Sequence, residues 1–220
     1  MIARKVGQQK GQSDNADDFR RIFIIRVHQL LDLGYRKLTP TDWSNHKEPA
    51  ITGELVRSME EITEDPHLKA FRHFEVHDDP HVNAPGRLGE NRYRLDIKVV
   101  SSQRLPKSRF PFEAKRLGKR HPVTKYVGPE GLGCFLRGDY GATEDDAGML
   151  GYVQLDTAEN WAGKIQAKFE EPHNNFAVCD NYTWREYPMR SGPTYTYRTR
   201  HDRVSLGRPI DIYHTLLMFC

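Results

Sequence analysis

Two acidic residues and a lysine in the middle of the chain have the types and spacing of a hydrolytic site. Asp96 lies in Tyr93–Val100, where apolar and charged residues alternate, and Glu113 and Lys115 lie in Arg109–Leu117, which alternates in the same way. A polar turn containing a proline separates the segments, so they are predicted to pair as antiparallel strands. Positions 96 and 113 are equally distant from the centre of that turn. The two carboxyl groups are therefore expected to face each other.

These three side chains would suit a divalent cation and a phosphate. Residues opposite each other on antiparallel strands have Cβ atoms ~5 Å apart, and Lys115 shares a face with Glu113 because it follows two residues later. Facing carboxylates repel unless a cation joins them, and hard oxygen ligands favour Mg²⁺ or Mn²⁺. Such an ion would lower the pKa of a bound water and polarise a phosphoryl oxygen. Lys115 would orient the water or stabilise charge on the phosphate.

The charge distribution favours an anionic substrate. Residues 39–83 contain four Lys/Arg and ten Asp/Glu, whereas residues 84–125 contain twelve Lys/Arg and three Asp/Glu. The basic segment suits a phosphodiester backbone. The alternative is a solvated hairpin in which the acids and the lysine form an ordinary salt-bridge cluster. The residues predicted to bind nucleic acid are Arg94, Lys98, Arg104, Lys107, Arg109, Arg116, Lys119, Arg120 and Lys125.

Composition excludes several protein classes. The 220 residues are 37% hydrophobic and 29% charged, which indicates a polar globular protein. No segment approaches the ~20 apolar residues of a membrane span, and the basic, polar N-terminus does not resemble a signal peptide. The three cysteines are far apart and form neither a disulfide framework nor a metal knuckle. A cytoplasmic location is therefore expected.

Hydrophobic periodicity predicts one α/β domain around this hairpin. Helices are predicted over 17–33, closed by Gly34, and over 52–64. A strand is predicted over 73–77, a helix near Thr143, and another helix from Thr157 to Glu170. Strands are predicted at the C-terminus over 176–179, 195–199 and 210–216.

The hairpin and its neighbours resemble the PD-(D/E)XK nuclease superfamily, which has the restriction-endonuclease-like fold. The motif reads Leu95-Asp96 and, seventeen residues later, Glu113-Ala114-Lys115, with leucine in place of the motif's proline. The predicted order of elements also fits: helix, three strands with the motif on the second and third, helix, strand. The resemblance covers residues 54–154. It implies a central mixed β-sheet flanked by helices, here with an N-terminal accessory helix and C-terminal strands.

The resemblance also implies roles for the motif residues. Asp96 and Glu113 would ligate Mg²⁺ or Mn²⁺, the backbone carbonyl of Ala114 would join them, and Lys115 would serve the attacking water. A competing assignment uses Asp96 and Lys98 as the second half of the motif, with Asp78 or Asp79 upstream. That assignment leaves the strand-like Phe110–Leu117 outside the motif.

Two further catalytic residues are implied from neighbouring helices. Many members of the superfamily add a glutamate from the helix before the sheet, for which Glu54 is the candidate ligand and Glu61 the alternative. Some branches place a glutamine on the helix that follows the motif, and Gln154 is the candidate for that position. A zinc site at His73, His77 and His81 is a separate possibility, but Pro80 and the strand pattern disfavour it.

The expected function is a Mg²⁺-dependent (or Mn²⁺-dependent) endonuclease that hydrolyses double-stranded DNA, in restriction or anti-phage defence, as a homodimer or as a subunit of a larger defence complex. The alternatives are a non-catalytic nucleic-acid- or protein-binding module on the same fold, or an RNA-directed toxin nuclease. A single domain is expected over 1–220, with a helical extension at 1–38, a nuclease core at 50–180 and a β extension at 181–220.

Overall fold

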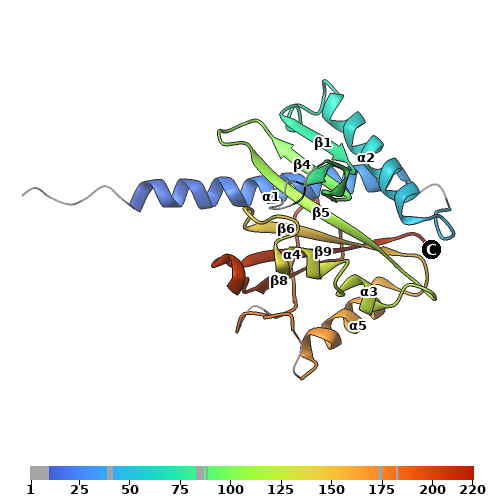
Figure 1. The fold of residues 1–220 in the computed structure, drawn as a ribbon. Helices are drawn as coiled ribbons and strands as arrows, with labels where there is room; N and C mark the ends of the chain where they lie inside the picture. The colour runs from blue at the N-terminus through green and yellow to red at the C-terminus, as the bar shows by residue number, and fades with distance from the viewer. Residues whose placement is uncertain (1–9, 39–41, 83–86, 88, 173–174, 182) are drawn as a thin grey trace, which may run out of the picture.

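The chain folds around one mixed β-sheet of seven strands, with helices on both faces (Figure 1). The computed structural model describes residues 10–38, 42–82, 87, 89–172, 175–181 and 183–220. The α/β class and the mixed central sheet are as the sequence predicts. Within the described residues, every helix is too short or too polar to cross a lipid bilayer.

The strands that carry the predicted motif lie in one half of the sheet. In spatial order the strands are β1 (Phe74–Asp78), β4 (Ile97–Ser101), β5 (Ser108–Leu117), β6 (Asp146–Val153), β9 (Ile210–Met218), β8 (Thr196–His201) and β7 (Arg185–Glu186). The pairs β1–β4 and β4–β5 are antiparallel, β6 is parallel to both β5 and β9, and the pairs β9–β8 and β8–β7 are again antiparallel. A separate two-stranded ribbon pairs β2 (His81–Val82) with β3 (Tyr93–Arg94).

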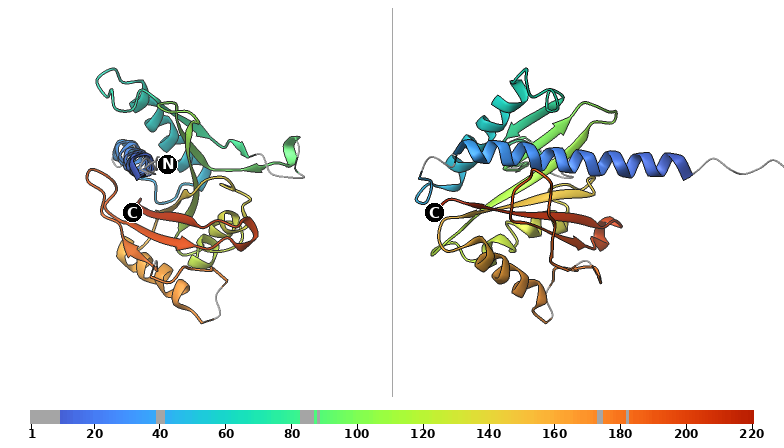
Figure 2. Two further views of the ribbon diagram at one scale, coloured as in Figure 1. Left: turned by 90° about the vertical axis from the view of Figure 1, so that its left-hand side faces the viewer. Right: turned by 180° about the vertical axis from the view of Figure 1, so that it is seen from behind.

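Two helical layers cover the sheet, as the side views in Figure 2 show. The first face packs against α1 (Lys10–Leu38) and α2 (Glu48–Glu64), and the second against α3 (Val123–Tyr126), α4 (Leu132–Arg137) and α5 (Ala158–Glu170). Short 3₁₀ helices occupy Gly89–Asn91 and Val204–Leu206. Because side chains alternate along each strand, one strand serves both cores. In β6, for example, Leu150 joins the first core and Met149 the second.

Gly34 does not end the first helix, contrary to the sequence prediction. The helix continues to Leu38, and a Cβ atom at Gly34 would lie 2.6 Å from Cγ of Met59 in α2. The glycine is therefore needed for close packing between two helices. The glycine was interpreted from the sequence as the end of a helix, but it is there because two helices pack closely.

The helix predicted near Thr143 is also wrong, because the segment forms strand β6. All eight of its residues are buried. Gly148 lies where a Cβ atom would be 2.1 Å from Cδ1 of Phe112 on the neighbouring strand. A central strand covered on both faces has no polar side to give a period of two. The small residues of this segment were therefore interpreted as those of a helix that packs closely against a sheet.

Most other predicted elements are present with shifted bounds. The segment Tyr93–Val100 is divided at Leu95–Asp96 into β3 and β4, which belong to different sheets. Helix α5 begins after Thr157, whose hydroxyl accepts a hydrogen bond from the Asn160 amide at 3.3 Å. The segment 176–179 contributes an isolated bridge at Val178 rather than a strand.

Candidate active site

Strands β4 and β5 pair in the register that places the two motif acids opposite each other. Ile97 is the partner of Phe112, so one step further along the hairpin Asp96 comes level with Glu113. The sequence prediction of this register is confirmed. Asp96 precedes the first residue of β4, and its Oδ2 accepts a hydrogen bond from the backbone N–H of Ala114 at 2.7 Å. The Asp96 carboxylate thus accepts the hydrogen bond that a backbone carbonyl would accept if β4 extended further.

Lys115 binds directly to the buried acid. Its Nζ lies 2.6 Å from Oε1 of Glu113 and 2.8 Å from the carbonyl oxygen of Ala114. The Glu113 side chain is only 5% exposed and that of Lys115 16%. The two side chains share one face of β5, as their spacing predicts. The structure therefore brings Asp96, Glu113, Ala114 and Lys115 together.

Helix α2 brings Glu48 to Lys115, whereas the predicted ligand Glu54 lies further along the helix. Helix α2 begins at Glu48, four residues before its predicted start. Glu48 Oε2 accepts a hydrogen bond from the Arg116 backbone N–H at 2.9 Å, and Oε1 lies 3.5 Å from Lys115 Nζ. We call Asp96, Glu113, Lys115 and Glu48 the acidic site.

Glu54 and the alternative, Glu61, lie further along α2 and pair with other side chains. Glu54 binds Arg57, three residues away on the same helix, and Glu61 binds Lys37 at 2.8 Å. The sequence held a signal for the correct residue. Pro49 occupies the first turn of the helix, where proline is favoured because its missing N–H would have no partner there.

Gln154 lies near the acidic site, but not on a helix as predicted. It follows the last residue of β6, and its side-chain amide donates to the carbonyl oxygens of Trp43 at 2.9 Å and His46 at 2.8 Å. Both carbonyls belong to the loop that leads into α2. Gln154 therefore fixes the loop that precedes Glu48, which is the role of a positioning residue.

Burial and mutual repulsion dominate the electrostatics of the acidic site. Burial and the neighbouring Asp96 raise the pKa of Glu113 to about 9, although Lys115 opposes the change. Burial likewise raises the pKa of Asp96. Burial lowers the pKa of Lys115, but Glu113, Glu48 and Asp96 outweigh it, so this pKa lies above its ordinary value. Lys115 is therefore a cation held among acids that resist ionisation.

The acidic site offers one buried oxygen atom to a hard cation. Glu113 Oε2 is buried and makes no hydrogen bond to the other described residues, which is costly for a polar atom. The ammonium of Lys115 already contacts oxygens of Glu113, Ala114 and Glu48, so a positive charge is accommodated there. Among the described residues, no three His, Cys, Asp or Glu side chains are grouped closely enough to hold a metal ion, neither at the acidic site nor at His73, His77 and His81.

A cavity of mixed charge lies along the same face of the hairpin as the acidic site. It has a volume of about 350 Å³, and Lys98, Arg109 and Pro111 contribute to its lining. Lys98 and Pro111 are cross-strand partners two residues from Asp96 and Glu113, so they share their face. The loop at 138–144 adds Asp139 and Glu144 to the lining. The cavity therefore presents two cations and two acids, and the residues of the acidic site do not line it.

The other residues predicted to bind nucleic acid have different surroundings. Arg94 pairs with Asp79, Lys107 lies 3.1 Å from Glu75, and the Arg104 guanidinium lies 5.2 Å from the ring centre of Phe19. The structure gives Arg116 a 3.5 Å contact to the His46 carbonyl. Three exposed cations lie beyond the C-terminal end of β5: Lys119, Arg120 and Lys125.

The acidic site and the glutamine that binds the loop before Glu48 thus come from four segments of the chain: the start of α2, the break before β4, the middle of β5 and the end of β6. Compared with known proteins, the chain matches no protein-family model, no curated protein and no solved structure.

Proposed function

We propose that this protein is a divalent-cation-dependent nuclease of the PD-(D/E)XK type. One observation carries the proposal: Asp96 and Glu113 stand opposite each other on adjacent strands, and Lys115 Nζ lies 2.6 Å from the glutamate. An ordinary surface salt bridge would not bury its acid to 4% exposure. Buried acids that share one cation are more typical of sites that bind or react.

The topology supports a restriction-endonuclease-like core. Helix α2 is followed by β1, β4 and β5 as successive sheet neighbours, and then by short helices and the parallel strand β6. This is the order of helix, three strands, helix and strand that the resemblance implies. The motif acids lie at the second and third of these strands, since Asp96 immediately precedes β4 and Glu113 lies within β5.

In this proposal Asp96, Glu113 and the Ala114 carbonyl hold Mg²⁺ or Mn²⁺, with Glu48 as a further carboxylate. The ion would supply water of lowered pKa and polarisation of the scissile phosphate. Lys115 remains protonated, because the acids around it raise its pKa. It therefore acts as a hydrogen-bond donor that orients water or stabilises charge on a phosphoryl oxygen, rather than as a base.

Nucleic acid is the proposed substrate because cations lie on the hairpin that carries the acids. Lys98 and Arg109 line the adjoining cavity, and neither has an ion-pair partner among the described residues. Duplex DNA remains the expected substrate, and RNA is the alternative that the test must include. The cations would neutralise backbone phosphates without reading the sequence.

The test is cleavage by the purified full-length chain. Supercoiled plasmid, single-stranded DNA and RNA are each incubated with Mg²⁺, Mn²⁺ or EDTA, using the wild type, Glu113→Gln and Lys115→Ala. Metal-dependent cleavage by the wild type alone is expected. Glu54→Gln is the matched control, because it removes a carboxylate from α2 away from the acidic site. Binding without cleavage would instead favour the non-catalytic module, and cleavage by both site variants would overturn the assignment.

A further inference from the structure

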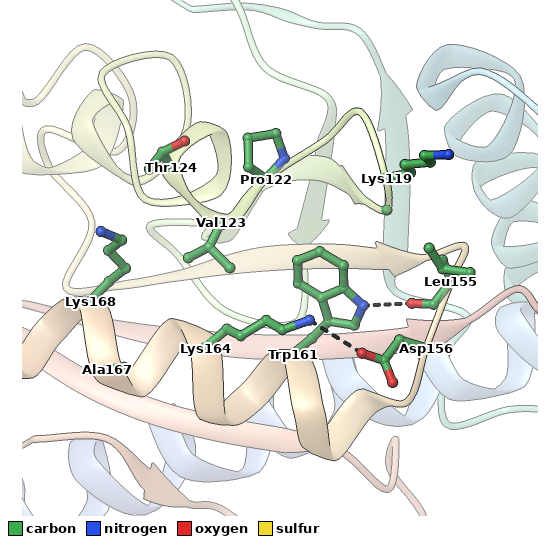
Figure 3. Close-up of a pocket in the computed structure, with 11 residues that line it drawn as sticks. Lys119, Pro122, Val123, Thr124, Leu155, Asp156, Trp161, Lys164, Ala167 and Lys168 are labelled. Atoms are coloured by element: carbon green, nitrogen blue, oxygen red, sulfur yellow. Dashed lines mark hydrogen bonds and ion pairs between the residues drawn. The ribbon is translucent and has the colours of Figure 1, made fainter.

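A second, larger groove lies between α3 and α5 (Figure 3), and the mechanism above does not use it. Its volume is about 540 Å³. Pro122 and Val123 form one side, and Trp161 and Lys164 on α5 form the other. We call it the α3–α5 groove. Its size is within the range of ligand pockets.

The groove is apolar at its base and basic at its border. Three lysines and one aspartate line it: Lys119, Lys164, Lys168 and Asp156. Lys164 lies 3.2 Å from Asp156 and 4.2 Å from the ring centre of Trp161. Lys119 is exposed and has no ion-pair partner among the described residues. Lys168 lies 2.5 Å from Glu171, so among the described residues that line the groove Lys119 is the lysine without an ion-pair partner. It supplies positive charge beside aromatic and aliphatic surface.

The groove begins where the two strands next to the acidic site leave the sheet. Gly118 and Lys119 follow directly after β5, and Leu155 follows Gln154 at the end of β6. The Gln154 backbone N–H donates to the Leu117 carbonyl at 2.9 Å, which keeps these two ends together. Lys119 is four residues beyond Lys115, a reach of ~13 Å in extended chain.

Resting on the proposed nuclease function, we infer that the α3–α5 groove binds an unpaired segment of the substrate strand, adjacent to the phosphate that the acidic site cleaves. Lysines would contact the phosphates, and the apolar base would cover nucleobases. Bases within a duplex are stacked and paired, so only an opened or single-stranded segment can offer them to such a surface. The groove thereby favours substrates with a single-stranded region next to the cleavage position.

Binding without metal tests this inference separately from cleavage. The probe is a fluorescein-labelled 20-nucleotide single-stranded DNA, measured by anisotropy in EDTA at physiological salt. Lys119→Glu/Lys168→Glu is expected to weaken binding at least about tenfold and to reduce the salt slope by about 0.7 per lysine. The matched control is Lys69→Glu/Arg72→Glu, which makes the same charge change on exposed residues beyond the far end of α2. It is expected to bind within about twofold of the wild type.

A second variant tests the apolar base. Leu155 is 53% exposed, so Leu155→Ser should fold normally. It is expected to weaken binding of the single-stranded probe about threefold and to leave an abasic probe of the same length unaffected. Unchanged affinity in both groove variants would overturn the inference and leave the groove to a protein partner. Equal loss for duplex and single-stranded probes, with no effect of Leu155→Ser, would also overturn it.

The cleavage assay separates the two proposals. If the wild type binds the probe through the groove but cuts no nucleic acid, the nuclease proposal fails and the groove assignment stands. If the wild type cuts and the groove variants bind and cut as it does, the nuclease proposal stands and the groove assignment fails.

Discussion

Glu113 is buried, lies beside the acid Asp96 and contacts Lys115, and these three features together set its pKa. With a pKa of about 9 it is mostly neutral at pH 7 unless a cation offsets the repulsion from Asp96. The same environment that makes a carboxylate costly in the folded protein makes it a strong ligand once a cation is present. Under the proposed function, the acidic site would give up stability in return for cation binding.

Replacing Glu113 should separate these two effects. Glu113→Gln is expected to reduce cleavage by about a thousandfold or more, because an amide cannot supply the carboxylate. Its free energy of unfolding should stay within about 1 kcal/mol of the wild type, because glutamine resembles the neutral acid in shape and charge. Gel assays of cleavage and urea unfolding at pH 7 measure the two quantities. A variant that unfolds below room temperature would contradict the second expectation.

Glu48 and Glu54 form a matched pair on one helix. Glu48→Gln is expected to lower cleavage about tenfold to a hundredfold, since it removes a carboxylate near Lys115 and weakens the contact to the Arg116 backbone. Glu54→Gln should leave the rate unchanged, because Glu54 binds only Arg57 in this region. Initial rates on one DNA substrate compare them. Equal rates for both variants would remove Glu48 from the acidic site.

At the scale of elements, the sequence predicted the hairpin better than the strands and helices around it. The alternation of Phe110, Phe112 and Ala114 reports a strand with two different faces, and the turn fixes its register. Strand β6 has no such contrast, because helices cover both of its faces. One proline was the only sequence signal for the start of α2. The contact between Glu48 and Arg116 joins residues far apart in the sequence, so no local pattern predicts it.

Glycines test the packing of β6 against β5. Gly148→Ala would place a methyl group 2.1 Å from Cδ1 of the buried Phe112 ring, and it is expected to destabilise the protein by about 1–3 kcal/mol. Gly163→Ala is the control, because it lies in α5 with open space around it. That change should stabilise the protein by about 0.5–1 kcal/mol, since alanine favours helix. Thermal unfolding monitored by circular dichroism measures both shifts, and the same sign for both would contradict the packing.

At the scale of the whole molecule, a chain of hydrogen bonds crosses the second core. The Phe176 carbonyl lies 2.8 Å from His201 Nδ1, and His201 Nε2 lies 2.6 Å from the Thr199 hydroxyl. The hydroxyl lies 2.8 Å from His214 Nε2, and His214 Nδ1 lies 3.1 Å from the hydroxyl of Tyr126. Neutral imidazoles fit this chain, because each ring donates through one nitrogen and accepts through the other.

Three fully buried histidines therefore make folding sensitive to acid. Burial lowers the pKa of His28 and His201 to about 4. The nearby Asp211 and Asp202 raise the pKa of His201 but do not offset burial. Burial, with the neighbouring His201, lowers the pKa of His214 well below its ordinary value. The unfolded chain thus binds protons that the folded protein excludes, over the range from about pH 6.5 down to about pH 4.

Stability is accordingly expected to be full above pH 6.5 and to fall as the pH decreases towards 4. Between pH 7.5 and 5.5 the three histidines should remove about 4 kcal/mol from the free energy of unfolding. Glu113 acts in the opposite direction, because its raised pKa makes the folded protein bind the proton, so the measurement uses the Glu113→Gln variant. Urea titrations at each pH give the free energy. A flat profile would contradict the neutral, buried state of the histidines.

The position of β9 has a consequence for when the protein can fold during translation. Although it is the last strand in the sequence, β9 lies between β6 and β8 in the interior of the sheet. A chain that is still being translated lacks this strand until residues 210–218 have been made, so the edge of β6 stays unpaired until then. Products that stop before Ile210 lack the same strand. Under the proposed function, the nuclease would stay inactive on the ribosome until β9 emerges.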